Sequence, residues 1–159
     1  MKVRILGVNI DKYTIAEASD KILEMLDSDT FHMVFTPNSE IIMQAYREKE
    51  FCDMLNSADM LTADGIGVVY ASRYLKNQID ERCAGYDVSC AVLDKIKGSK
   101  HSVFLFGSKP GYAEEASKKL AEKYPGLKIA GTRNGYFSKK DEPEIIREIN
   151  ESGADLLFV

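Results

Sequence analysis

The sequence predicts an α/β protein with a mostly parallel, Rossmann-like sheet and helices on both faces. Short apolar runs, such as residues 101–106 and 155–159, alternate along the chain with segments whose apolar residues recur at helical spacing. Strands of a parallel sheet are buried on both faces, so their sequences are continuously apolar. A chain of 159 residues is long enough to bury its own core. We therefore expect a single domain over residues 1–159.

Capping and turn residues place the individual elements. Thr14 and Glu17 have the spacing of a capping box, which marks a helix start. Helices are expected at 14–27, 39–57 with a break near Glu48, 68–75, 87–97, 112–124 and 143–152. Strands are expected at 31–35, 60–62, 101–106, 127–131 and 155–159. The last strand looks like a buried central one with nothing after it, so we expect a domain truncated at its C-terminus.

Composition excludes several classes of protein. The net charge of −4 argues against a nucleic-acid partner, which requires a basic surface. No apolar run is long enough to span a membrane, and the first residues do not resemble a secretory signal, so a cytoplasmic location is expected. The three cysteines form no C-x-x-C pair, and we interpret them as reduced thiols.

Ligands of open α/β sheets bind beyond the carboxyl ends of the strands, where loops and helix N-termini present backbone N–H groups. This rule selects residues that directly follow expected strands. The candidates are Thr36, Asn38, Asp64, Gly107, Ser108, Gly135 and Tyr136. Position alone leaves two roles open for Asp64, which either faces a cleft as a reactive carboxylate or caps the helix after it. Asn38 has the same two alternatives.

Charged groups in connecting segments suggest how a diphosphate would be held. The D-x-D pair of Asp27 and Asp29 precedes a strand, which puts it at the amino end of the sheet, away from the expected cleft. We therefore expect neither a metal site nor a cofactor. Arg82, in a polar connector, is then a candidate for contacting the phosphates. The loop 107–111 joins a strand to a helix and could also cradle phosphate, although it matches no standard nucleotide-binding pattern.

Several motifs together resemble the WecG/TagA/CpsF family of glycosyltransferases. They are residues 36–40 (TPNSE), 58–59 (AD) with 62–67 (TADGIG), 81–87 (ERCAGYD), 106–111 (FGSKPG) and 134–137 (NGYF). Their order and spacing are more specific than any one motif, and they cover nearly the whole chain. The resemblance implies that Asp64 is the catalytic base, that Thr36 and Asn38 line the donor cleft, and that Arg82 approaches the diphosphate.

The resemblance also implies an activity. The family includes enzymes that move N-acetylmannosamine from UDP onto undecaprenyl-diphosphate-linked N-acetylglucosamine during wall teichoic acid synthesis, and the sequence looks most like that branch. The expected partners are therefore a UDP-sugar donor and a polyprenyl-diphosphate-linked sugar acceptor at the inner face of the cell membrane. A family segment that follows residue 159, and a C-terminal region associated with the membrane, would complete the site.

Three other interpretations remain at this stage. A related family member would use another UDP-sugar, and a fragment would bind a nucleotide sugar without catalysis. An assembly protein would use its apolar surfaces to form a homo-oligomer. A preference for UDP over other nucleotides separates the first two from the third.

Overall fold

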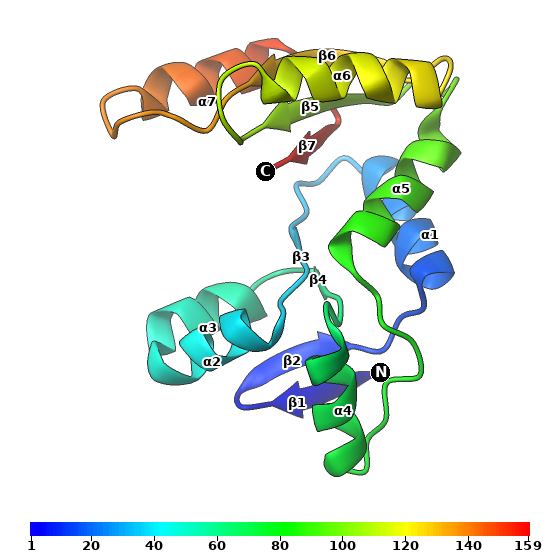
Figure 1. The fold of residues 1–159 in the computed structure, drawn as a ribbon, viewed down its shortest axis with the longest axis vertical. Coiled ribbons are helices and arrows are strands. Elements are labelled where there is room, and N and C mark those ends of the chain that lie inside the picture. Colours follow the sequence, from blue (N-terminus) through cyan, green and yellow to red (C-terminus); the bar gives the residue numbers. More distant parts are fainter. The chain divides into compact units, whose positions relative to one another are not determined.

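The computed structural model describes residues 1–159 and divides into two compact units, Met1–Val92 and Leu93–Val159 (Figure 1). Helix α5 (Gly85–Ile96) runs across the boundary between them. The strands form three separate sheets, two in the first unit and one in the second. The expectation of a single domain over residues 1–159 stays a prediction.

The first unit begins with an antiparallel hairpin that the sequence analysis missed. Strand β1 (Lys2–Ile5) pairs with β2 (Val8–Asp11), and Leu6 and Gly7 connect them with φ angles of 48° and 97°. Positive φ at both central residues is what a two-residue type I′ turn requires. The inward side chains of the hairpin alternate along the sequence and are buried: Val3, Ile5, Val8 and Ile10. That alternation was the available signal.

A short parallel pair forms the second sheet of this unit. Strand β3 (Val34–Phe35) pairs with β4 (Met60–Leu61). The expected strand at 31–35 was too long, and Phe31 is 84% exposed. At Met33 the N–H donates to the carboxylate of Asp59 at 2.9 Å rather than to a backbone carbonyl of β4, so the ladder begins at Val34.

The helices of the first unit follow the predicted pattern. They are α1 (Ile15–Leu26), α2 (Ser39–Arg47), α3 (Lys49–Asn56) and α4 (Ile66–Tyr74). Thr14 and Glu17 form the expected capping box at the start of α1. Glu48, with extended φ and ψ of −120° and 98°, separates α2 from α3 where a break was expected. Apolar side chains of the hairpin, α2, α3, β4 and α4 form one buried core.

The second unit is a βαβαβ arrangement, as predicted. Strand β5 (Ser102–Phe106) lies between β6 (Lys128–Arg133) and β7 (Leu156–Phe158), and both pairings are parallel. Helix α6 (Tyr112–Lys123) packs on β5 and β6, and α7 (Glu142–Glu151) leads to β7 (Figure 1). A Cβ at Gly131 would lie 2.5 Å from the ring of Phe104, so this position of β6 accommodates only glycine beside that ring.

The α/β class with mostly parallel strands is confirmed, since only the β1–β2 hairpin is antiparallel. Each predicted site segment also follows the strand expected for it, β3, β4, β5 or β6. None of the helices has the length and apolar character needed to cross a bilayer.

Candidate functional site

Three helix N-termini gather beyond the carboxyl ends of β3 and β4 in the first unit. Helix α4 approaches α2 closely, because a Cβ at Gly67 would lie 3.1 Å from the Ser39 hydroxyl. Helix α5 approaches the loop after β3, because a Cβ at Gly85 would lie 2.7 Å from the Thr36 hydroxyl. Helix N-termini carry partial positive charge, and the N-terminus of α4 has no side-chain cap on its N–H groups. The arrangement is therefore suited to a negatively charged ligand.

Asp64 lies where these elements meet. The two preceding residues, Thr62 and Ala63, are fully buried, and Asp64 itself is half-buried. Its Oδ2 accepts a hydrogen bond from the backbone N–H of Gly85 at 3.4 Å. The carboxylate is thus held by the first residue of α5, a helix that begins 21 residues later in the sequence.

The alternative role for Asp64, as cap of the following helix, is wrong for α4. Gly65 is the N-cap residue of α4, with φ of 87°, and no side chain makes a capping hydrogen bond there. A side chain at residue 65 would be strained at that φ, so glycine suits the turn between Asp64 and the helix.

Asn38, by contrast, is a helix cap. Its Oδ1 accepts from the backbone N–H groups of Glu40 and Ile41, both at 3.0 Å, at the start of α2. The capping bonds use Oδ1 alone, which leaves the Nδ2 group for a ligand. The Cβ of Asn38 also lies near Gly65, at 4.0 Å from the position of a Cβ there. The structure therefore brings Thr36, Asn38 and Asp64 together.

Arg82 follows the buried residue Ile79 in the connector and pairs with an acidic residue of α5. Its Nη2 donates to Oδ2 of Asp87 at 3.0 Å, and about half of the Arg82 side chain, 53%, is exposed. Asp87 lies in the first turn of α5, so the guanidinium is positioned beside the same helix N-terminus that holds Asp64. Sequence reasoning did not identify Asp87 or Gly85 as partners, although both lie in the motif at 81–87.

Cys83 supports this site from within the protein. Its N–H donates to the carbonyl oxygen of Ala63 at 3.0 Å, and its side chain is fully buried. Burial, with a smaller effect from the nearby negative charge of Glu81, raises the pKa of the Cys83 thiol to about 11. A neutral, buried thiol is a packing group rather than a nucleophile.

The remaining four candidates form a second cluster, within the second unit. Two backbone hydrogen bonds join the loops after β5 and β6, from the Gly107 N–H to Arg133 and from the Gly135 N–H to Ser108, at 2.9 and 2.8 Å. A Cβ at Gly135 would lie 3.1 Å from the Cα of Gly107, so the loops touch through glycine. Gly107, Ser108, Gly135 and Tyr136 are thereby brought together.

Tyr136 borders an open depression on this unit. The depression, of about 520 Å³, is lined by Gly135, Tyr136, Phe137, Ser138 and Asp141. The Tyr136 side chain is 68% exposed, while its N–H donates to Oδ1 of Asn134 at 3.0 Å and fixes the turn. The ring of Phe137 packs against Phe106, with centroids 5.6 Å apart. An exposed aromatic ring on a fixed turn can stack on a planar or sugar-like ligand.

The acidic D-x-D pair lies apart from the strand ends. Asp27 is the C-cap residue of α1, and Asp29 is exposed in the loop that leads toward β3. No group of three or more His, Cys, Asp or Glu side chains gathers in the chain in a way that could hold a metal ion.

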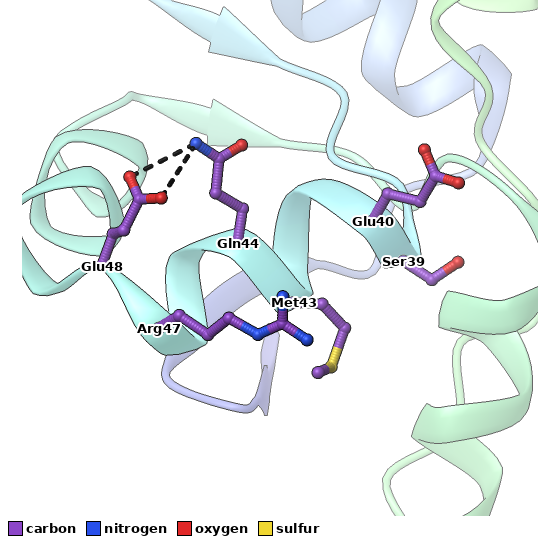
Figure 2. Close-up of a pocket in the computed structure, with 6 residues that line it drawn as sticks. All are labelled: Ser39, Glu40, Met43, Gln44, Arg47 and Glu48. Carbon is purple, nitrogen blue, oxygen red and sulfur yellow. Dashed lines mark hydrogen bonds between the residues drawn. The ribbon is translucent and has the colours of Figure 1, made fainter.

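A second depression, of about 390 Å³, runs along α2 (Figure 2). It is lined by Ser39, Glu40, Met43, Gln44, Arg47 and Glu48. Figure 2 shows Met43 and Arg47 on the same side of the helix, while Gln44 donates to the carboxylate of Glu48. It contains none of the predicted site residues.

Comparison with known proteins agrees with these motifs. The profile described as "Glycosyl transferase WecG/TagA/CpsF family" matches residues 3–159. The chain belongs to this family. Among family members, the Bacillus subtilis (strain 168) protein named N-acetylglucosaminyldiphosphoundecaprenol N-acetyl-beta-D-mannosaminyltransferase is 33% identical over 134 residues, 84% of this chain and 52% of the relative. Proteins of the same name from Bacillus spizizenii and Staphylococcus aureus (strain NCTC 8325) are 34% and 30% identical, covering 84% and 99% of this chain.

The chain spans about half the length of the Bacillus members of the family, 52% and 51%, and 62% of the Staphylococcus member. The match to the family profile includes both site clusters, the one around Asp64 and the one around Gly135.

Proposed function

We propose that the protein is an inverting glycosyltransferase that moves N-acetylmannosamine from UDP to undecaprenyl-diphosphate-linked N-acetylglucosamine. The names of the relatives motivate the choice of donor sugar and acceptor. The observation that carries the proposal is the position of Asp64, a carboxylate held at the N-terminus of α5 beyond the end of a parallel strand. This step belongs to the linkage unit of wall teichoic acid.

In the proposed reaction Asp64 acts as general base. It accepts the proton of the acceptor hydroxyl while that oxygen attacks the anomeric carbon of the donor sugar. The bond from that carbon to the β-phosphate oxygen breaks, and UDP leaves with the bonding electron pair. Attack from the face opposite the leaving group inverts the anomeric centre. A positioned base contributes about 10²–10⁴-fold to the rate of such a step.

The leaving diphosphate requires stabilisation of its negative charge. We assign this task to Arg82, whose guanidinium lies beside the N-terminus of α5. Gly107 and Ser108 are proposed to contact the substrate within the second unit, where the Gly107 N–H is already bonded to the Arg133 carbonyl oxygen. Thr36 and the Nδ2 group of Asn38 are proposed to contact the donor. Gly135 and Tyr136 are proposed to form a shelf for the substrate.

We propose that no metal or other cofactor takes part, because Asp27 and Asp29 lie at the amino end of β3 rather than beside Asp64. A lipid-linked acceptor supports the further proposal that the reaction takes place at the inner face of the cell membrane. A membrane contact through a C-terminal region, which the family resemblance implies, belongs to the same proposal. Homo-oligomerisation is a separate proposal, which the resemblance does not supply.

Calorimetric titration with UDP, ADP and GDP tests the proposed donor. We expect binding of UDP in preference to the other two, and unchanged UDP affinity in EDTA. Equal affinity for the three nucleotides would contradict the proposal, and affinity that returns only with magnesium or manganese would contradict its metal-independent form. Transfer of labelled N-acetylmannosamine to a lipid-linked acceptor tests the reaction itself.

A second candidate function is nucleotide-sugar binding without catalysis. It is favoured by one observation, that the chain spans about half the length of the Bacillus relatives. This candidate predicts the same UDP preference but no transfer by residues 1–159, with transfer appearing in a longer chain that includes the family's following segment.

A further inference from the structure

Helix α4 exposes an apolar stripe to solvent. Ile66, Tyr70 and Tyr74 are spaced four residues apart, so they lie on one side of the helix. Their exposed fractions are 54%, 59% and 89%. The opposite side of α4 already packs into the core through Val68 and Val69. A helix that is apolar on both sides is normally buried on both sides.

Helices α6 and α7 each expose one large apolar side chain, Tyr112 and Ile146, rather than a stripe of three. The exposed sides of α6 and α7 carry lysine, arginine and glutamate, several of them in ion pairs along the helix. Helix α4 contains no acidic residue, and the charged residue on its exposed side is Arg73. Its surface therefore differs from an ordinary solvated one in both polarity and charge.

Basic residues border the stripe. The Arg73 guanidinium carbon lies 5.7 Å from the centroid of the Tyr70 ring, and Lys76 is exposed just beyond the end of α4. Strand β1, which packs against α4, adds the exposed Arg4. The nearest acidic residues along the sequence, Asp64 and Asp80, lie outside the helix at either end. With a chain net charge of −4, this basic character is local.

We propose that this α4 patch, made of Ile66, Tyr70, Arg73, Tyr74, Leu75 and Lys76, docks on the surface of an anionic lipid bilayer. Tyrosine side chains favour the headgroup level of membranes because their rings are apolar and their hydroxyls polar. Lysine and arginine beside them are attracted to anionic headgroups. A helix lying flat in the interface presents this combination of residues.

The position of the patch gives the docking a purpose. Ile66 is two residues after Asp64, so the stripe begins at the proposed base and runs away from it along α4. Docking through α4 would bring Asp64 to the bilayer that carries the lipid-linked acceptor. The link between docking and the acceptor rests on the proposed function. Binding of the α4 patch to lipid does not depend on it, because lipid binding does not require glycosyl transfer.

Vesicle sedimentation tests the proposal with the chain itself. Vesicles of phosphatidylglycerol and phosphatidylcholine in equal parts should sediment the protein, and pure phosphatidylcholine vesicles should sediment much less. The double variant Arg73→Gln/Lys76→Gln should bind the anionic vesicles about tenfold more weakly or worse, since each basic residue near the surface strengthens binding about fivefold. Tyr70→Ser/Tyr74→Ser should also weaken binding, to both kinds of vesicle.

Matched controls come from α6. Tyr112 is 60% exposed and Lys118 is exposed, so Tyr112→Ser/Lys118→Gln removes one exposed aromatic ring and one charge from the second unit and leaves the patch intact. This variant should sediment like the wild type, and all variants should keep the wild-type melting temperature. The proposal would be overturned if the control and patch variants lost vesicle binding equally, or if the wild type did not sediment with anionic vesicles.

Two further measurements separate the alternatives. Sedimentation equilibrium reports whether the patch instead joins two copies of the chain, and a mass that falls to the monomer in the tyrosine variant would contradict lipid docking. UDP titration of the patch variants should be unchanged. If the wild-type protein sediments with anionic vesicles but does not bind UDP in preference to ADP and GDP, the proposed function is contradicted and the docking proposal still holds.

Discussion

The side chain of Thr36 fills the space into which a side chain at Gly85 would project. A Cβ at residue 85 would lie 2.7 Å from Thr36 Oγ1 and 3.1 Å from its Cγ2. Real Cβ atoms do not approach other atoms this closely, so the N-terminus of α5 reaches the end of β3 only because residue 85 is glycine. The same approach places the Gly85 N–H within reach of Asp64.

Gly85→Ala should therefore destabilise the protein by about 1–3 kcal/mol, the usual cost of overpacking. Chemical denaturation measures the change. Thr36→Ala removes the two nearest atoms, so the double variant should lose less stability than the sum of the single changes. Strict additivity of the two substitutions would contradict the contact. Gly98→Ala cannot serve as the control for a glycine-to-alanine change, because φ is positive at Gly98 and any side chain there would strain the backbone.

Asp64→Asn separates proton transfer from structure. The Asn carbonyl can still accept from the Gly85 N–H, so the melting temperature and UDP affinity should stay near wild type. Transfer should fall by about 10²–10⁴-fold, because an amide cannot take the proton of the acceptor. Asp64→Ala would in addition remove the acceptor of the Gly85 N–H. An Asn variant with normal turnover would exclude Asp64 as the base.

Arg82→Ala should weaken transfer by about 1–3 kcal/mol in transition-state free energy, through loss of a charge-assisted contact to phosphate. Its effect on folding should be small, because the Arg82–Asp87 ion pair is largely exposed and such pairs contribute about 0–1 kcal/mol. Arg147→Ala is a matched control, since Arg147 is an exposed arginine paired with Glu144 on α7. Equal kinetic effects of the two substitutions would leave Arg82 without a special role.

Cys83 should react more slowly with iodoacetamide than the partly exposed Cys52 and Cys90. Burial raises its pKa from the ordinary value of 9.0 to about 11, so the folded state holds the proton more tightly than the unfolded state. The resulting stability is fully present below pH 9 and is lost as the pH rises toward 11. Peptide mapping after alkylation measures reactivity, and Cys83→Ala should flatten that part of the stability profile. Rapid labelling of native Cys83 at neutral pH would contradict the buried, neutral thiol.

Asn38→Ala should lower stability by about 0.5–2 kcal/mol, because two N–H groups of α2 lose their acceptor. Asn38→Asp keeps an acceptor oxygen and should fold like the wild type. The Asp variant lacks the Nδ2 donor, however, and brings a negative charge toward the diphosphate, so we expect weaker UDP binding. UDP affinity equal to wild type in Asn38→Asp would remove Asn38 from the donor cleft.

Local signals in the sequence were sufficient for much of the fold. The capping box at Thr14 and the break near Glu48 depend on neighbouring residues, and both were predicted. The β1–β2 hairpin was missed because its turn uses Leu6, a residue that rarely adopts positive φ. The strand at 31–35 was placed too early because Phe31 is apolar, whereas pairing with the short β4 decides where β3 begins.

In the candidate site, too, features that depend on neighbouring residues could be predicted, and features that depend on distant residues could not. The rule that ligands bind at the carboxyl ends of strands selected residues that the structure gathers in two clusters. The role of Asp64 as cap of α4 could not be excluded from the sequence, because its hydrogen-bond partner is a backbone N–H 21 residues away. Its role as base stays a prediction. The role of Gly85 could not be predicted from the sequence. Glycine is required there because the Thr36 side chain occupies the space of a Cβ at residue 85, and this contact is known only from the structure.

The contact between Gly131 and Phe104 has an evolutionary consequence. A Cβ at residue 131 would lie 2.5 Å from the Phe104 ring, so a larger residue there is tolerated only if residue 104 becomes smaller in the same lineage. We expect these two positions to covary among homologous chains, with glycine opposite an aromatic ring and larger residues opposite aliphatic ones. Correlated substitutions at residues 104 and 131 in a family alignment would then reveal the pairing of β5 with β6.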